Sequence, residues 1–310
     1  MTWLIVAILS YFLLAVVFLL DKYLLAQRIP DPKVYAFSIG LLSILILVII
    51  PFVGFTIPET KVLIISLLTG AIFVLALFWF FKALRDFEAS RVVPTVGALS
   101  PIFTLILFYF FSEGKETLSS GQFLAFSLLV IGTVLILKEK GKFISLKSFK
   151  LSFLAAFLFS LYFVLLKYVY LVLSFWQGTI LTRIGGFLMA LLFFLAFKEV
   201  RQEVFKKRTI FNFPRVNFIK STLSLFFLAR IGSGVAGLLQ LWAVFLAPLY
   251  AVAIINALQG TQYLFLFFLT LFLSLKSPQI LKEEVSSQTI LQKILGILLI
   301  SFGIAILTLF

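Results

Sequence analysis

Residues 3–20 read WLIVAILSYFLLAVVFLL, an apolar run without a single charged side chain. A membrane-spanning α-helix needs about 20 predominantly apolar residues to cross the hydrocarbon core of a bilayer. No basic leader and no small-residue cleavage site accompany the run, so it does not have the pattern of a secretory signal peptide. It therefore predicts a first transmembrane helix over Met1 to Leu20.

The composition extends this prediction to the whole chain. Of the 310 residues, 63% are hydrophobic, 40 are Phe, and only 12% are charged. A soluble domain usually carries about 25% charged residues. Too little polar surface remains to cover a water-facing globule of this size, so lipid is the expected solvent. We therefore expect an all-α, multi-pass integral membrane protein of the plasma or inner cell membrane, with the lipid bilayer as its surroundings.

Residue types that the chain lacks narrow its chemistry. It contains no Cys and no His, which removes thiolate nucleophiles, the usual zinc ligands and the commonest general base. The phosphate-binding pattern Gly-x-x-x-x-Gly-Lys-Ser/Thr is also missing, so we expect no direct use of ATP. We predict that the protein is not an enzyme and holds no metal or cofactor. The net charge of +14 does not indicate a nucleic-acid partner, because the basic residues fall in short loops between apolar runs.

Ten apolar runs are long enough to span a membrane. They lie near residues 3–20, 34–56, 62–82, 92–112, 120–137, 151–173, 176–197, 221–244, 249–275 and 289–309. If consecutive loops alternate sides, 20 Lys and Arg residues face one side, and only Lys61 and Lys115 face the other. The positive-inside rule then places the basic side in the cytoplasm and both termini outside.

An internal repeat relates the two halves of the chain. Matching pairs recur in the same order, with offsets that grow from 145 to 171 residues: Lys22-Tyr23 with Lys167-Tyr168, Ile39-Gly40 with Ile184-Gly185, Ala98-Leu99 with Ala257-Leu258, and Glu113 and Gly132 with Glu284 and Gly303. We interpret residues 1–140 and 150–310 as two five-helix repeats joined by a basic loop at 141–149. Because five is odd, the second repeat is inverted in the membrane, an arrangement used for alternating access around a site near the midplane.

Several short motifs resemble the EamA-type members of the drug/metabolite transporter superfamily. They are the stretch ALRDFEASRVVP at 83–94, Leu99-Ser100-Pro101, the turn Ser112-Glu113-Gly114-Lys115-Glu116, and Leu129-Val-Ile-Gly132-Thr-Val-Leu. The resemblance implies a ten-helix fold and a transporter role, and Lys22, Lys167 and Arg183 resemble charged positions of that family. It names no substrate, since members handle amino acids, sugars, nucleotide-sugars and drugs. Many relatives are drawn with both termini inside, which is the alternative to the orientation that the loop charges predict.

Four cations within or at the end of predicted helices are the first candidates for substrate binding, because an intramembrane charge is expensive. They are Lys22, Lys167, Arg183 and Arg230. The alternative for Lys22 and Lys167 is that they extend to the interface and only anchor their helices. No carboxylate falls securely in the middle of a predicted helix, so we expect a facilitator or exchanger. A basic cavity would favour an anionic or carboxylate-bearing solute, such as an amino acid.

Uncharged polar and aromatic residues form the second set of candidates. They are Trp79, Ser100, Gln240, Trp242, Asn256, Gln259, Gln262 and Tyr263. Their alternative role is helix–helix hydrogen bonding, worth only about 0.6 kcal/mol on average in a membrane.

The sequence thus predicts a secondary transporter, working as a facilitator, exchanger or exporter, with a small-molecule solute as its partner. Two alternatives share the fold: a lipid-intermediate flippase and a multidrug exporter. A membrane-embedded enzyme is the least favoured reading. The oligomeric state stays open, and a monomer is compatible with the sequence.

Overall fold

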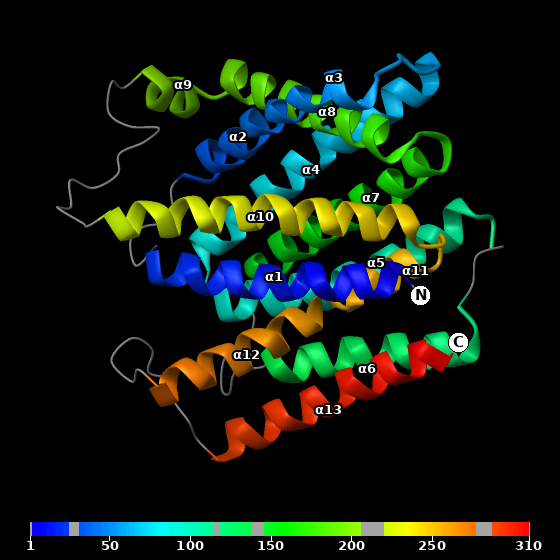
Figure 1. The fold of residues 1–310 in the computed structure, drawn as a ribbon, viewed down its shortest axis with the longest axis vertical. Coiled ribbons are helices and arrows are strands. Elements are labelled where there is room, and N and C mark those ends of the chain that lie inside the picture. Colours follow the sequence, from blue (N-terminus) through cyan, green and yellow to red (C-terminus); the bar gives the residue numbers. More distant parts are fainter. Residues whose placement is uncertain are drawn as a thin grey trace. The chain divides into compact units, whose positions relative to one another are not determined.

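The computed structural model describes residues 2–24, 31–87, 89–114, 118–137, 146–205, 220–276 and 287–309. Every regular element in these ranges is a helix (Figure 1). The helices are α1 (Thr2–Leu24), α2 (Pro32–Leu42), the 3-10 helix η1 (Ser43–Ile49), α3 (Ile50–Val53), α4 (Thr60–Asp86), α5 (Ala89–Phe111), α6 (Ser120–Leu137), α7 (Leu146–Val172), α8 (Phe175–Ala196), α9 (Lys198–Phe205), α10 (Lys220–Leu246), α11 (Ala251–Ala257), α12 (Gln259–Lys276) and α13 (Ser287–Leu309). The prediction of an all-helical protein is confirmed for the part of the chain that is described.

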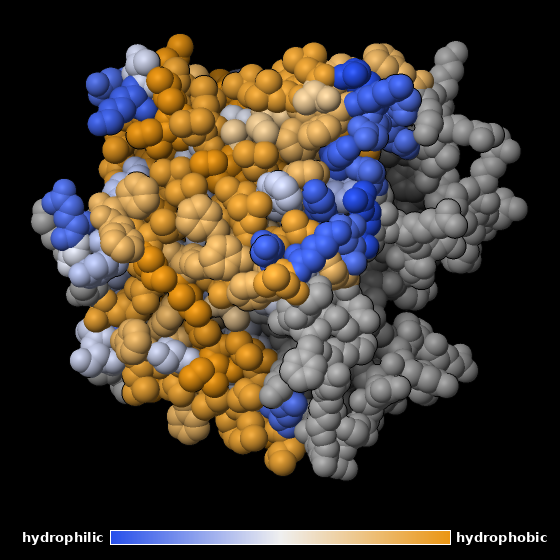
Figure 2. Space-filling view, turned by 180° about the vertical axis from the view of Figure 1, so that it is seen from behind, coloured by the Kyte–Doolittle hydropathy of each residue, from blue (hydrophilic) through white to orange (hydrophobic). Residues whose placement is uncertain are grey.

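Four helical stretches are long and apolar enough to cross a membrane, judged by length and composition over the described residues. They are Pro32–Val53, Thr60–Asp86, Leu146–Val172 and Phe175–Ala196, and six shorter apolar stretches accompany them. Large hydrophobic side chains are exposed on many helices, and Figure 2 shows a face that is mostly hydrophobic, with hydrophilic residues toward its edges. Such a surface suits hydrocarbon, and the chain is a multi-pass membrane protein.

Two of the predicted runs are not continuous α-helices. The run at 34–56 changes to a 3-10 helix over Ser43–Ile49. This segment comes just before Pro51, which lacks a backbone N–H and so cannot donate to a carbonyl of the preceding turn. The run at 249–275 divides at Leu258, where α11 ends and α12 begins. There the backbone N–H and the hydroxyl of Thr261 both donate to the Leu258 carbonyl, at 2.9 and 2.7 Å.

The C-terminus of α5 shows why the Ser112-Glu113-Gly114 turn has its sequence. Glu113 and Gly114 both adopt positive φ, at 53° and 76°. The N–H of Gly114 donates to the carbonyl of Tyr109 at 2.9 Å, and that of Glu113 donates to Phe110 at 3.2 Å. This left-handed ending satisfies carbonyls that the helix leaves unpaired, and glycine adopts it without strain.

The chain forms two compact units that are each assembled from both halves of the sequence. Unit 1 takes Met1–Arg28, Gly97–Phe143 and Ile219–Phe310, and unit 2 takes Ile29–Val96 and Ile144–Phe218. In unit 1, α1 lies along α10, and α6 lies along α13 (Figure 1). In unit 2, α4 packs against both α7 and α8, and α2 packs against α8.

Glycines bring the backbones of unit 2 together. A Cβ placed on Gly70 of α4 would lie 2.6 Å from the backbone nitrogen of Gly186 and closer still to the carbonyl oxygen of Thr182, both on α8. A Cβ on Gly185 would lie 2.7 Å from the Cα of Leu67. These residues therefore form a reciprocal contact in which α4 and α8 approach without side chains between them, as small residues allow in membrane helices.

Candidate functional site

Arg183 lies in the interior of α8 within unit 2, half-buried. Its guanidinium carbon is 5.8 Å from the centroid of the Phe73 ring on α4, within the range of a cation–π contact. Among the described residues no carboxylate forms an ion pair with Arg183; the described pairs involve Lys33 and Arg85 instead. A guanidinium that lacks an internal anion in a membrane protein is a candidate for binding one from outside.

The helix contacts of unit 2 explain the position of Arg183. Thr182, the preceding residue, is the one whose carbonyl touches Gly70, so the backbone of α8 is held against α4 at this point. Gly70 and Phe73 are three apart in α4 and share a helix face. The contact thus brings Phe73 beside Arg183.

Lys167 is the second candidate cation in unit 2. It lies near the end of α7 and is 3% exposed. Lys167, in a helix ending at Val172, and Arg183, in a helix beginning at Phe175, both lie within about 12 Å of the turn that joins the two helices, at 1.5 Å per residue. Between α7 and α8 the Tyr170 hydroxyl and the Thr179 hydroxyl share a hydrogen bond of 2.8 Å. That bond adds a polar contact between the two helices that carry the cations.

Trp79 has a different environment from Arg183. The Lys82 ammonium lies over its ring at 4.7 Å, and over the Phe78 ring at 5.9 Å. These three residues lie in the last turns of α4. Trp79 therefore packs with a lysine close to a helix end, an arrangement typical of a membrane–water interface.

The predicted polar residues of unit 1 form two separate hydrogen-bonded groups. In the first, the Gln240 amide donates to the Tyr11 hydroxyl at 3.3 Å, and that hydroxyl donates to the carbonyl of Ile255 at 2.9 Å. In the second, the buried Asn256 amide donates to the Thr104 hydroxyl at 2.8 Å. Each group includes one residue of α11, Ile255 or Asn256, close to the end of that helix at Ala257.

The remaining candidates of unit 1 lie around these groups. The Gln259 amide donates to the Tyr263 hydroxyl at 3.3 Å within α12, and Gln262 is half-buried on the same helix. Ser100 is buried in α5, and its carbonyl accepts a bond from Thr104 at 2.8 Å. Trp242 is 37% exposed, with its ring 5.4 Å from that of Phe245. Asn256 therefore lies in α11, whereas Gln259, Gln262 and Tyr263 lie in α12.

Two candidates, Lys22 and Arg230, have side chains that lie outside the described residues, although their backbones belong to α1 and α10. Sequence reasoning missed Tyr11, Thr104 and Phe73. Tyr11 had a signal, because Ser10 and Tyr11 are the only hydroxyl-bearing residues between Trp3 and Leu20. No feature of the sequence distinguishes Phe73 from the other Phe residues, of which the chain has 40 in total.

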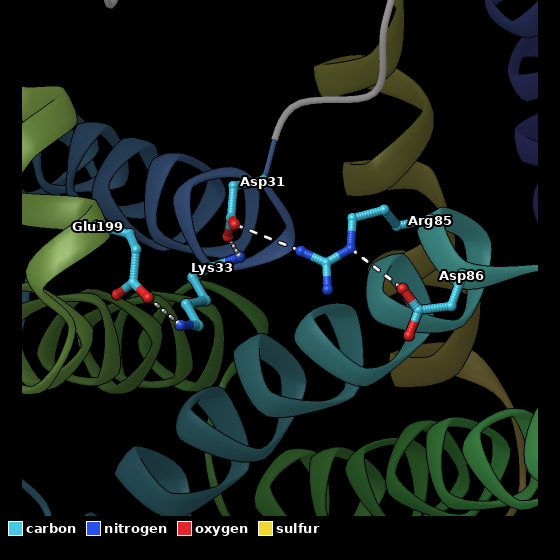
Figure 3. Close-up of polar contacts among 5 residues, drawn as sticks. All are labelled: Asp31, Lys33, Arg85, Asp86 and Glu199. Atoms are coloured by element: carbon cyan, nitrogen blue, oxygen red, sulfur yellow. Dashed lines mark hydrogen bonds and ion pairs between the residues drawn. The ribbon is translucent and has the colours of Figure 1, made fainter.

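An ion-pair network joins the ends of α2, α4 and α9 in unit 2 (Figure 3). The Lys33 ammonium contacts Glu199 at 2.7 Å, and Arg85 contacts Asp31 at 3.4 Å and Asp86 at 3.2 Å. The hydrogen bond from Lys33 lowers the pKa of the exposed Glu199 carboxyl from its usual value of 4.5. Each cation of this network already has a carboxylate partner, so it is less suited than Arg183 to receive an anionic solute.

Comparisons with known proteins agree with the resemblance noted in the sequence. The family model described as the EamA-like transporter family matches residues 1–138. Among solved structures, 28 chains match. One of them is described only as the crystal structure of a protein and is 17% identical in sequence. The alignment covers 99% of this chain and 97% of that chain, with a TM-score of 0.65. At this identity the likeness shows a shared fold alone. No curated protein matches the chain.

Proposed function

Residues 1–138 belong to the EamA-like transporter family of the drug/metabolite transporter superfamily, and from this premise we propose that the chain is a secondary transporter. It moves a small organic solute across the cell membrane by alternating access between two inverted five-helix repeats. The proposal assigns no chemical step and no cofactor to the chain.

The observation that carries this proposal is a symmetry in the helix pairs. The sequence repeat relates α1 to α7 and α4 to α10. In unit 1, α1 packs along α10, and in unit 2, α7 packs along α4. Replacing each helix of the first pair by its counterpart in the repeat gives the second pair. The pairs α2 with α8 and α6 with α13 each join a helix to its own repeat mate. Exchange of partners is what a two-fold relation between the halves would produce.

A second feature supports the same mechanism. The interruption at Leu258 falls inside an apolar run that corresponds, in the repeat, to α5. Interrupted helices near the midplane are a recurring feature of transporters built from inverted repeats, because they leave backbone groups free to bind a solute or ion. The hydroxyl of Tyr11 already serves one such carbonyl, that of Ile255.

We also propose that the solute carries a negative charge. Arg183 is a permanent cation with five N–H donors, and no described residue neutralises it through an ion pair. Burying an uncompensated charge is costly, so an anion that reaches the guanidinium gains both Coulomb energy and charge-assisted hydrogen bonds. A carboxylate-bearing metabolite fits this requirement.

Solute counterflow in proteoliposomes tests the proposal. Vesicles preloaded with unlabelled leucine, succinate, glucose 6-phosphate or UDP-glucose are diluted into the same labelled compound, and uptake above that of protein-free vesicles is measured. We expect at least one anion-bearing compound to accumulate. Uptake should be lost in Arg183→Gln and kept in Lys61→Gln, which removes an exposed cation at the start of α4. The absence of counterflow with all four compounds would count against a solute with a negatively charged group and would favour the alternatives of the same fold, a multidrug exporter or a lipid-intermediate flippase.

A further inference from the structure

The Arg183 guanidinium is supported by an aromatic ring on one side. Its central carbon lies 5.8 Å from the centroid of Phe73. Hydrogen bonds would normally hold a guanidinium in a fixed plane, yet among the described residues Phe73 is the contact that orients it. A ring contact uses the π surface and leaves the N–H donors unoccupied. The orientation of Arg183 therefore depends on where Phe73 lies.

Phe73 is itself held by two further rings of α7. The Tyr162 ring lies 4.8 Å from it at an interplanar angle of 41°, and the Phe159 ring lies 6.4 Å away at 65°. Tyr162 is buried, with 6% of its surface exposed, so it cannot move aside without opening the packing of α7. One turn earlier on α4, Gly70 is fixed against the α8 backbone.

Phe73 is thus clamped between α7 and α8. Its position follows from backbone contact on one side and ring packing on the other. A side chain fixed in this way can hold a mobile guanidinium without bonding to its N–H groups.

We propose that Phe73 is a positioning residue for the oxyanion site of Arg183, which rests on the proposed function. The ring holds the guanidinium plane so that its donor edge can form two parallel hydrogen bonds to one planar oxyanion. A carboxylate is the ligand class that best matches this fork. Lysine would supply the charge but not the fork.

The inference separates two contributions to transport. Arg183 supplies the charge and the hydrogen bonds to the solute, whereas Phe73 touches only Arg183. Loss of the Phe73 ring should therefore weaken solute binding while the transport cycle continues. This outcome differs from a general loss of packing, which would lower the amount of folded protein or the maximal rate.

The test uses the compound that gives the fastest counterflow among leucine, succinate, glucose 6-phosphate and UDP-glucose. KM and maximal rate are measured for Phe73→Leu, for Phe73→Tyr, and for the control Phe80→Leu. Phe80 is a half-buried Phe of the same helix whose ring contacts are with Phe81 and Phe159. Leucine keeps an apolar side chain of similar size, whereas tyrosine restores the ring.

We expect Phe73→Leu to raise KM about 3- to 30-fold, as expected for loss of a cation–π contact, with the maximal rate little changed. Phe73→Tyr and Phe80→Leu should keep the wild-type KM. An unchanged KM in Phe73→Leu, or an equal rise in Phe80→Leu, would overturn the positioning role even if Arg183→Gln abolishes transport. Failure of the proposed function is recognised separately, by full uptake in Arg183→Gln or by the absence of counterflow with every compound.

Discussion

Substituting Gly70 by alanine should separate α4 from α8 and destabilise unit 2. The new Cβ would lie 2.6 Å from the Gly186 nitrogen, whereas an ordinary contact begins at 3.4 Å. The helices would have to move apart by at least 0.8 Å, and by more at the Thr182 carbonyl. The obstacle is backbone, so no side-chain rotation relieves it. Overpacking of this kind costs about 1–3 kcal/mol, occasionally more.

Gly234 of α10 provides the matched control for this substitution. A Cβ on Gly234 meets nothing within 4 Å, and alanine is the better helix former. Gly234→Ala should therefore be neutral or slightly stabilising. The assay is unfolding of the purified protein in detergent by increasing SDS, followed by the fluorescence of its four Trp residues. Equal stability of Gly70→Ala and Gly234→Ala would refute the backbone contact between α4 and α8.

Three further outcomes follow from contacts elsewhere in the chain. Gly260→Ala should lower the melting temperature, because the new Cβ would meet the Thr133 hydroxyl. The obstacle here is a side chain, so adding Thr133→Ala should restore much of the lost melting temperature. Glu199→Gln should be less stable than wild type at pH 7, because Lys33 lowers the pKa of the Glu199 carboxyl. A carboxyl with a lowered pKa stabilises the fold above its usual pKa of 4.5, and this stability is lost as the pH falls through the lowered value. The difference between the melting temperatures of the two proteins should therefore vanish well below pH 4.5. Arg183→Lys should recover little of the uptake lost in Arg183→Gln, measured by the counterflow assay, because a lysine cannot form a planar, two-bonded fork.

The apolar runs predicted most of the helices, because a bilayer imposes a minimum length on any segment that crosses it. The sixth run illustrates the accuracy: it was expected over 151–173, and α7 spans Leu146–Val172. The errors occur where local interactions oppose a uniform helix. The division at Leu258 coincides with two bonds from Thr261 to the Leu258 carbonyl, and hydrophobicity alone contains no signal for it. The short α9 was missed because it is too polar and too brief to form a span, although Val200 is fully buried.

Less of the candidate site than of the fold could be predicted from the sequence. Arg183 could be predicted, since a charge in an apolar run has few structural explanations. The partners of the polar residues could not, because they lie far apart in the chain: Gln240 and Tyr11 are 229 positions apart, and Asn256 and Thr104 are 152 apart. Such pairs become visible only when the helices are placed side by side.

The inverted repeat is the central claim, and the absence of Cys from the sequence makes it directly testable. A single cysteine is introduced in place of Glu59, just before α4, or Gln202, in α9, both exposed and in loops that the repeat makes equivalent. Five proposed spans, α4 to α8, separate the two positions. In intact cells a membrane-impermeant maleimide should label the Glu59→Cys variant and not Gln202→Cys, and permeabilisation should expose both. Labelling of both variants from the same side of the intact membrane would contradict the inverted arrangement.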